Sequence, residues 1–233
     1  MPQSKGFGES TGRIKLEESN DRMGFIRKVY MILATQLIFT TIITIIPLVS
    51  DSAKDYLYNN IWILIVAAIF SIALSCALIC VRSLARKVPT NYILLGLFTL
   101  CESLIVAYSA AATEPRTVVM AACLTAAIVI GLTVYAITTK TDFTTCLAAA
   151  WMLGFLLLGF GLMAIIFQSY VVTVVYCALA VIVFGFYLII DTQLVVGGRT
   201  HQLCEDEYIM GALILYIDIV VLFLKLLAIL GRR

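Results

Sequence analysis

Charged residues are scarce in this chain of 233 residues. Lys, Arg, Asp and Glu together make up 13% of it, about half the usual share of roughly 25% in soluble domains. This shortage excludes a disordered chain and a nucleic-acid-binding surface, and a net charge of +2 is too small to support a binding argument. With one His, the chain also lacks the imidazoles for a metal site built on histidine clusters.

Signs of an extracellular protein are also missing. The sequence contains no Asn-x-Ser/Thr glycosylation site. Six of the seven cysteines lie inside apolar runs, where Cys behaves as a small hydrophobic residue, and only Cys204 lies in a polar loop. The sequence therefore predicts no disulfide framework, and an intracellular membrane is favoured over an extracellular surface.

Apolar residues are what the chain has in excess. They make up 62% of the sequence, against roughly 45–50% in an average soluble domain. They fall into seven runs that are each long enough for a helix to cross a bilayer, which takes about 20 residues. Pro47, Pro89 and Pro115 lie at the edges of these runs, and no proline lies in the middle of one. The sequence predicts an all-α polytopic membrane protein with seven transmembrane helices, at residues 29–49, 61–81, 91–112, 117–137, 143–166, 171–196 and 209–230.

The polar segment 1–28 is predicted to be a solvated cytosolic N-terminal tail, and 29–233 the transmembrane domain. The first apolar run is too long for a signal peptide, and acidic residues in the tail argue against a mitochondrial presequence. With the N-terminus in the cytosol, the inside collects eleven Lys and Arg residues and the outside four, which is the orientation that the positive-inside rule favours. The C-terminal pair Arg232 and Arg233 would prefer the cytosol, which leaves a six-span variant with one re-entrant segment open.

Four charged residues lie within the apolar runs: Glu102, Asp191, Asp218 and Lys225. Each would cost about 2.5–3.5 kcal/mol at the bilayer centre. Lys225 lies close enough to a helix end to extend its ammonium to the interface. Glu102 is a secondary intramembrane acid, and either a structural hydrogen bond or a functional role fits it.

Asp191 and Asp218 lie on the last two predicted helices, which a short loop joins, so these helices are expected to be neighbours. At 1.5 Å per residue, Asp191 lies about 8 Å above Gly197–Gly198 and Asp218 about 15 Å above Asp206. The two carboxyl groups meet only if the last helix starts at a lower level than the end of the helix before it. If they meet, they share one proton and can bind Ca²⁺, which makes them a pH sensor and a tentative calcium site. The alternative is two separate acids, each paired with a Tyr or an Arg.

Two arginines, Arg82 and Arg86, are placed by the predicted topology at the same membrane face as Asp191. Either could form an ion pair that latches the inner end of a pore, or both could be ordinary loop charges on the cytosolic side.

Two stretches resemble a known family. GFYLIIDTQLVVGG (185–198) followed by EDEYIMGALILYIDIVVLFL (205–224) resembles the signature of the transmembrane Bax-inhibitor-motif family, and RKVPTNYILLGLFTLCES (86–103) resembles its lifeguard-type branch. The resemblance covers all seven predicted helices and leaves out the N-terminal tail.

The resemblance implies seven helices with the last one central, and a pH-sensitive calcium leak channel of endomembranes, in the endoplasmic reticulum or Golgi, linked to inhibition of cell death. By position, Asp191 and Asp218 match the family's paired aspartates, and Arg82 or Arg86 matches its latch arginine. Ile214 and Val221 stand where lifeguard relatives usually have Asn, which implies a drier pore lining. The expected partners are the lipid bilayer, calcium as the permeant ion, and cell-death regulatory membrane proteins; no cofactor and no nucleic acid are expected.

Two other functions could use the same intramembrane acids. A proton-coupled transporter could use the same buried acids, although no inverted repeat or broken helix pair supports it. An intramembrane aspartyl protease would need Gly-x-Gly-Asp at the second site, whereas Asp218 follows Leu-Tyr-Ile. The sequence therefore predicts a protein that is not an enzyme. The plasma membrane and the mitochondrial inner membrane remain alternative locations.

Overall fold

The computed structural model describes the backbone of residues 5–231 and the side chains of residues 20–81 and 83–231. Within this part the chain is helical and contains no strand, and seven helices are long and apolar enough to cross a membrane. This confirms the predicted polytopic all-α fold. The seven are α1 (Lys5–Val49), α3 (Ile61–Cys80), α5 (Thr90–Ala111), α6 (Pro115–Thr138), α7 (Leu147–Phe167), α8 (Tyr170–Val196) and α9 (Tyr208–Leu230).

Four short helices connect them. The amphipathic α2 (Asp51–Asn59) has no buried residue, and Ser50 caps its N-terminus by accepting a hydrogen bond from the Ala53 amide. The single turn α4 (Arg82–Arg86) precedes α5, and the 3₁₀ turns η1 (Phe143–Cys146) and η2 (Glu205–Glu207) lead into α7 and α9.

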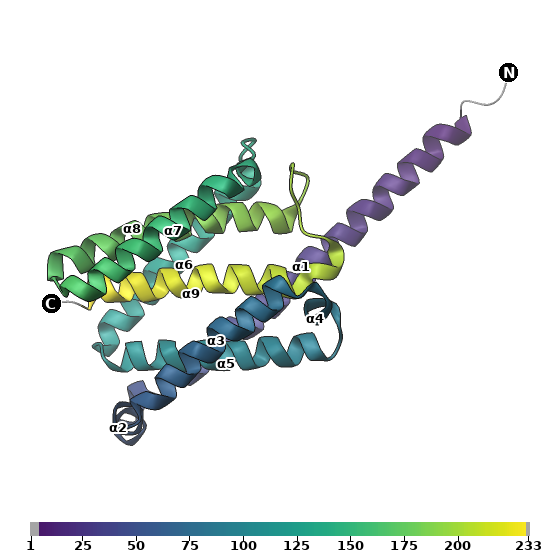
Figure 1. Ribbon diagram of the computed structural model, residues 1–233. Coiled ribbons are helices and arrows are strands. Elements are labelled where there is room, and N and C mark those ends of the chain that lie inside the picture. Colours follow the sequence, from purple (N-terminus) through teal and green to yellow (C-terminus); the bar gives the residue numbers. More distant parts are fainter. Residues whose placement is uncertain (1–4, 232–233) are drawn as a thin grey trace.

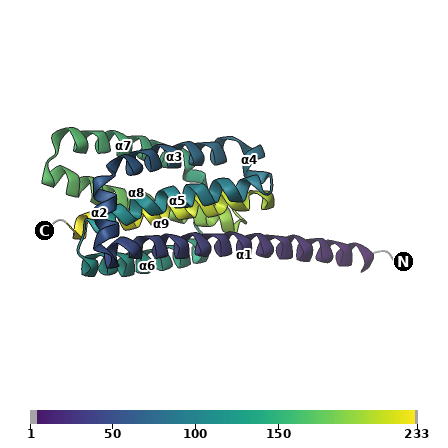
Figure 2. The ribbon, with the colours of Figure 1, turned by 90° about the horizontal axis from the view of Figure 1, so that it is seen from below.

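The long helices form three layers. Figure 2 shows α3 and α7 on one side, α5, α9 and α8 in the middle, and α1 and α6 on the other side. The contacts agree, because α9 packs against α1, α5, α6 and α8, while α3 packs mainly on α5 and α7 on α8. In Figure 1, α9 runs between the α7–α8 pair and the α3–α5 pair. The last helix is therefore central, as the family resemblance implies.

Burial explains this position. Ile209, Leu213 and Leu222 of α9 are fully buried, and buried residues occupy most of its circumference. A helix that is apolar all round is buried in a protein core or spans a membrane, and α9 does both. The outer helices expose large apolar side chains instead, including Ile69, Phe155 and Ile182. In a bilayer these side chains face lipid.

The N-terminal segment differs from the prediction. Helix α1 continues without a break from Lys5 through the predicted tail into the first span, and Phe25 is already buried in the core. Packing against the bundle therefore starts before residue 29. Residues 1–4 of the predicted tail lie outside the described part.

Candidate functional site

The structure brings Asp191 and Asp218 together. Their carboxyl groups lie within hydrogen-bonding reach of each other, where α8 crosses α9. Asp218 is buried, with 3% of its surface exposed, and Asp191 is half-buried. Both lie within membrane-spanning helices, so a carboxyl pair exists inside the apolar bundle.

The path of the loop between α8 and α9 brings the two aspartates close together. It returns along the end of α8, and the Leu203 amide donates to the Leu194 carbonyl at 3.0 Å. Helix α9 therefore starts lower than α8 ends, and Gly211 packs against Val195, where a Cβ would lie 3.2 Å from the valine methyl. From this shared level, Asp218 is about 10 Å and Asp191 about 6 Å along their helices, an offset that side chains can bridge.

The nearby tyrosine hydroxyls do not bind the two carboxyl groups. Tyr187 is in electrostatic contact with both carboxyls, but its hydroxyl donates to the Ala150 carbonyl at 2.6 Å. The Tyr216 hydroxyl, two residues before Asp218, is hydrogen-bonded to Thr40 at 2.7 Å instead. Oδ2 of Asp218 is buried and has no hydrogen-bond partner among the described residues.

The pair supplies two carboxylates and no further acidic ligand. Within the described residues, no group of three or more His, Cys, Asp or Glu side chains could hold a metal ion. A calcium ion there would need its remaining oxygen ligands from water or carbonyl groups, because Ca²⁺ takes six to eight.

Glu102 does not join the pair. It is half-buried on α5, and its carboxyl lies within hydrogen-bonding reach of the Ser71 hydroxyl on α3. The Ser71 hydroxyl donates to the Ala68 carbonyl of its own helix at 3.1 Å, so the structure places Glu102 beside α3 and apart from the pair.

A chain of buried hydroxyl and amide groups connects three of the helices. The Gln36 amide donates to Thr99 at 2.8 Å, and Ser103 donates to Thr40 at 3.0 Å. Thr40 in turn contacts the Tyr216 hydroxyl, so these groups connect α1, α5 and α9. In a bundle without water, such bonds fix the helices in register.

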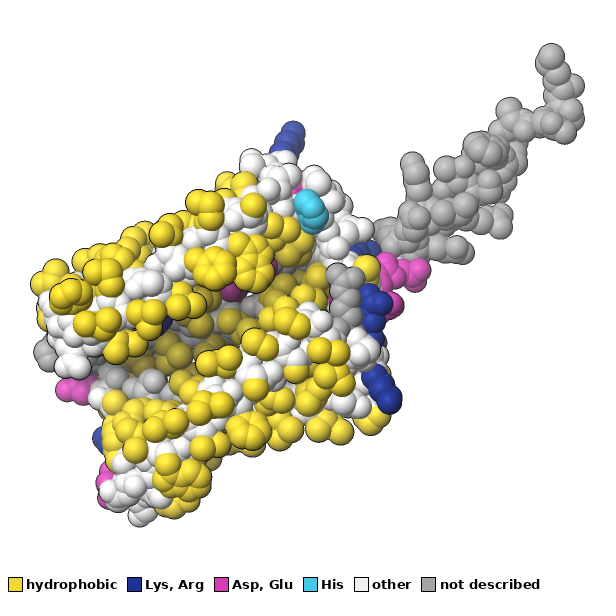
Figure 3. Space-filling model, viewed as in Figure 1, with side chains coloured by type: hydrophobic (Ala, Val, Ile, Leu, Met, Phe, Trp, Pro, Cys, Tyr) yellow, Lys and Arg dark blue, Asp and Glu magenta, His cyan; other side chains and the backbone are white. Residues whose placement is uncertain are grey.

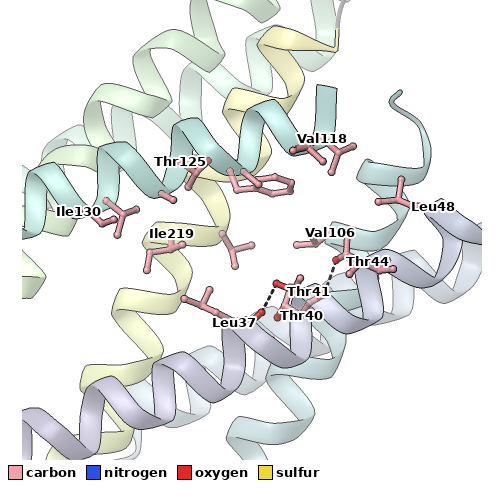
Figure 4. A pocket seen from close by; sticks show the side chains of 17 residues that line it. Leu37, Thr40, Thr41, Thr44, Leu48, Val106, Val118, Thr125, Ile130 and Ile219 are labelled. Carbon is pink, nitrogen blue, oxygen red and sulfur yellow. Dashed lines mark hydrogen bonds between the residues drawn. The ribbon is translucent and has the colours of Figure 1, made fainter. Parts of the chain in front are cut away.

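Next to these groups lies a cavity of about 530 Å³ between α1, α5, α6 and α9 (Figure 4). The threonines in its wall donate to backbone carbonyls of their own helices, as Thr44 does to the Thr40 carbonyl at 2.7 Å and Thr125 to the Ala121 carbonyl at 2.7 Å. Their hydroxyls are therefore already satisfied, and the cavity has an apolar lining unsuited to an ion.

The predicted latch is not formed by Arg86 in this structure. Its guanidinium donates to Oε1 of Glu207 at 3.1 Å and lies 3.9 Å from Asp206, and so it binds the start of α9 rather than Asp191. The physical reason is proximity, because α4 packs against η2 and the first turns of α9. The side chain of Arg82 lies outside the described residues, and its role as a latch stays a prediction.

Sequence reasoning missed Arg22, which was counted as a tail charge. Its guanidinium donates to four backbone carbonyls at the end of α8 and in the following loop, at 2.6–3.2 Å. The four acceptors are Leu194, Val195, Val196 and Leu203. Gly197, with φ of 79°, leaves room for this, since a Cβ there would lie 2.6 Å from the guanidinium. The Gly197–Gly198 pair is the sequence feature that could have indicated this close contact.

Gln193 and Asp142 were also missed. The buried Gln193 amide donates to the carbonyls of Ala136 and Thr141 and accepts from the Phe143 amide, and so it fixes the connection from α6 to α7 against α8. Asp142 accepts from the Thr144 amide and hydroxyl and from the Thr200 amide. These hydrogen bonds hold the pKa of Asp142 well below its usual range, and they join the two loops at this end of the bundle.

Seven spans around a central helix, with a carboxyl pair where the last two helices cross, define a polytopic membrane protein with an intramembrane acidic site. The chain belongs to the Bax-inhibitor family, because a family model described as "Inhibitor of apoptosis-promoting Bax1" matches residues 22–233. The match starts at Arg22, the residue that ties α1 to α8.

Similar proteins support this assignment. The chain is 34% identical to "Protein lifeguard 3" of Mus musculus over 216 residues, which cover 91% of this chain and 70% of that protein. It is 31% identical to "Protein lifeguard 3" of Homo sapiens over 235 residues, 99% of this chain and 76% of that protein. It is also 34% identical to "Protein lifeguard 4" of Mus musculus over 206 residues, 88% of this chain and 84% of that protein.

Proposed function

We propose that this protein is a pH-sensitive calcium leak channel of intracellular membranes, and that Asp191 and Asp218 are its cation and proton site. The observation that carries the proposal is the contact between the two carboxyl groups inside the bundle. Among the described residues no basic side chain forms an ion pair with either of them. No described basic side chain therefore neutralises the pair, which leaves its charge to be balanced by a proton or a cation.

The chemistry follows from repulsion. Two ionised carboxylates in contact repel each other strongly in an apolar site, so one bound proton or one cation between them lowers the energy of the pair. Carboxylate oxygens are preferred ligands of Ca²⁺, and a proton on the pair competes with the ion. Calcium flux through such a site depends on pH, and the role is transport rather than catalysis.

The biological setting is proposed from the family. Its description, an inhibitor of an apoptosis-promoting protein, supports a role in suppressing cell death. We place the protein in the endoplasmic reticulum or Golgi, with the N-terminus and Arg86 in the cytosol, calcium as the permeant ion and cell-death regulatory membrane proteins as partners.

The test is calcium flux into liposomes that contain the purified full-length protein, measured over a pH series with a trapped fluorescent calcium indicator. The wild type should show flux that changes with pH. Asp191→Asn combined with Asp218→Asn should remove the pH dependence, because no proton is shared. Since the two groups titrate as one unit, each single substitution should produce most of the effect of the double one.

Glu102→Gln is the matched control, because it neutralises a second intramembrane acid that does not contact the pair. It should leave the pH profile unchanged. An unaltered pH profile in the double variant would end the sensor hypothesis, and flux that requires a proton gradient would favour a proton-coupled transporter.

A further inference from the structure

A second cavity, of about 650 Å³, lies at the opposite end of α9 from its N-terminus, between α7, α8 and α9. One wall consists of apolar side chains of α7, and the other contains Thr173 and Tyr176 of α8 and Lys225 of α9. Gln168, at the turn between α7 and α8, lines the end of the cavity. Figure 3 shows this face of the molecule hollowed between α7 and α3, with acidic as well as basic atoms visible in the hollow.

Lys225 contributes a positive charge that no described acidic side chain neutralises. Its ammonium donates to the Tyr176 hydroxyl at 3.4 Å and lies 4.6 Å from the centre of the Tyr176 ring. Both contacts are with a neutral group, so the charge itself stays uncompensated within a membrane-spanning helix. Gly161 allows this arrangement, because a Cβ there would lie 3.2 Å from the tyrosine ring.

The end of α8 adds to the positive field. Helix α8 starts at Tyr170, beside the cavity, and the side chain of its N-cap residue Ser169 makes no capping hydrogen bond. The amide groups of the first turn carry the positive end of the helix dipole. An anionic group beside Lys225 would therefore meet a full positive charge and a partial one.

The apolar wall identifies the kind of ligand. Leu158, Leu162 and Ile165 of α7 line the cavity and are 55–69% exposed, so in a bilayer they face lipid. A ligand that matches both halves of the cavity carries an anionic head and an acyl chain. We propose that this cavity binds an anionic phospholipid, with its phosphate at Lys225 and the start of α8 and one acyl chain along the apolar wall of α7.

The proposal is tested by native mass spectrometry of the full-length protein, with phosphatidylglycerol or phosphatidylcholine of identical acyl chains. The wild type should retain phosphatidylglycerol in preference to phosphatidylcholine. Lys225→Gln should weaken phosphatidylglycerol binding by about tenfold, the loss expected for one charge-assisted hydrogen bond, and leave phosphatidylcholine unchanged. Lys225→Arg should retain most of the preference.

Lys54→Gln is the matched control, since Lys54 lies on α2 and does not line the cavity. It should bind both lipids as the wild type does. If Lys225→Gln does not fold, Gly161→Ala gives an independent test, because its methyl group pushes Tyr176 into the cavity and should weaken phosphatidylglycerol binding without removing a charge.

Three results would overturn the proposal. One is equal retention of the two lipids by the wild type. Another is an unchanged preference in a folded Lys225→Gln variant. The third is complete displacement of phosphatidylglycerol by inorganic phosphate, which would identify a site for free anions rather than for a lipid.

Discussion

Arg22→Ala should loosen the end of α8 that carries Asp191. Arg22 donates to four carbonyls, and its two shortest contacts are 2.6 Å to Leu203 and 2.7 Å to Val195. A hydrogen bond from a charged donor contributes about 1.5–3 kcal/mol. Because one half-exposed guanidinium shares the four contacts, they do not add, and we expect a loss of about 3 kcal/mol.

The assay is hydrogen exchange in detergent micelles, followed by mass spectrometry of peptides from residues 194–204. A loss of about 3 kcal/mol in local stability corresponds to exchange that is roughly 100-fold faster. Arg22→Lys keeps the charge but not the planar fork, so its exchange rate should lie between those of the wild type and the alanine variant.

Arg27→Ala is the control, because Arg27 is an exposed arginine on the same helix. It should leave exchange in this segment unchanged. The reasoning is refuted if Arg22→Ala accelerates exchange no more than Arg27→Ala does.

Two further predictions concern the loops at the same end of the bundle. Gln193→Leu should destabilise the protein by about 3 kcal/mol, because it leaves the carbonyls of Ala136 and Thr141 and the Phe143 amide without partners. Chemical denaturation measures this loss, with Gln202→Leu as an exposed control. A loss no larger than that of the control would contradict the prediction. Asp142→Asn should lower the melting temperature by an amount that depends on pH. The folded-state pKa of Asp142 is depressed, so its stabilising effect is complete above the ordinary pKa of about 4 and is lost as the pH falls towards the folded value. The difference from the wild type should therefore be constant from about pH 8 to about pH 5 and shrink below about pH 4, and a difference that grows on acidification would refute this sign.

The seven spans could be predicted because the signal for them is local. A helix that crosses a bilayer needs about 20 apolar residues, and each run in this sequence has that length by itself. Hydropathy could not show that α1 extends back to Lys5, because a helix in water needs no apolar run. The burial of Phe25 depends on contacts with the rest of the bundle, and no pattern within the segment announces it.

The two acids of the carboxyl pair could be predicted from the sequence, but their contact could not. Two acids on the last two apolar runs were visible in the sequence, but their heights depend on where the connecting loop goes. The bond from Leu203 to Leu194 sets that path, and it joins two backbone groups that any residues would have supplied. The role of Arg22 could not be predicted for the same reason, because its hydrogen-bond acceptors are backbone carbonyls. The hydroxyls of Tyr187 and Tyr216 are close to the two acids in the sequence but bind elsewhere, because helix rotation decides their direction.

The two ends of the Asp191–Asp218 crossing are built differently. At one end, Arg22, Gln193 and the Leu203 amide all bind within one turn of the end of α8, so three independent contacts fix the height of Asp191. Beyond the pair, Lys225 lies seven residues after Asp218, on the same face of α9 and about 10 Å further along it. On that face α9 borders a cavity, while Leu222, Leu226 and Leu227 elsewhere on the helix are buried. Because closely packed contacts resist displacement more than a cavity wall does, the position of Asp191 is set from the end of α8, while the surroundings of α9 beyond Asp218 can adjust.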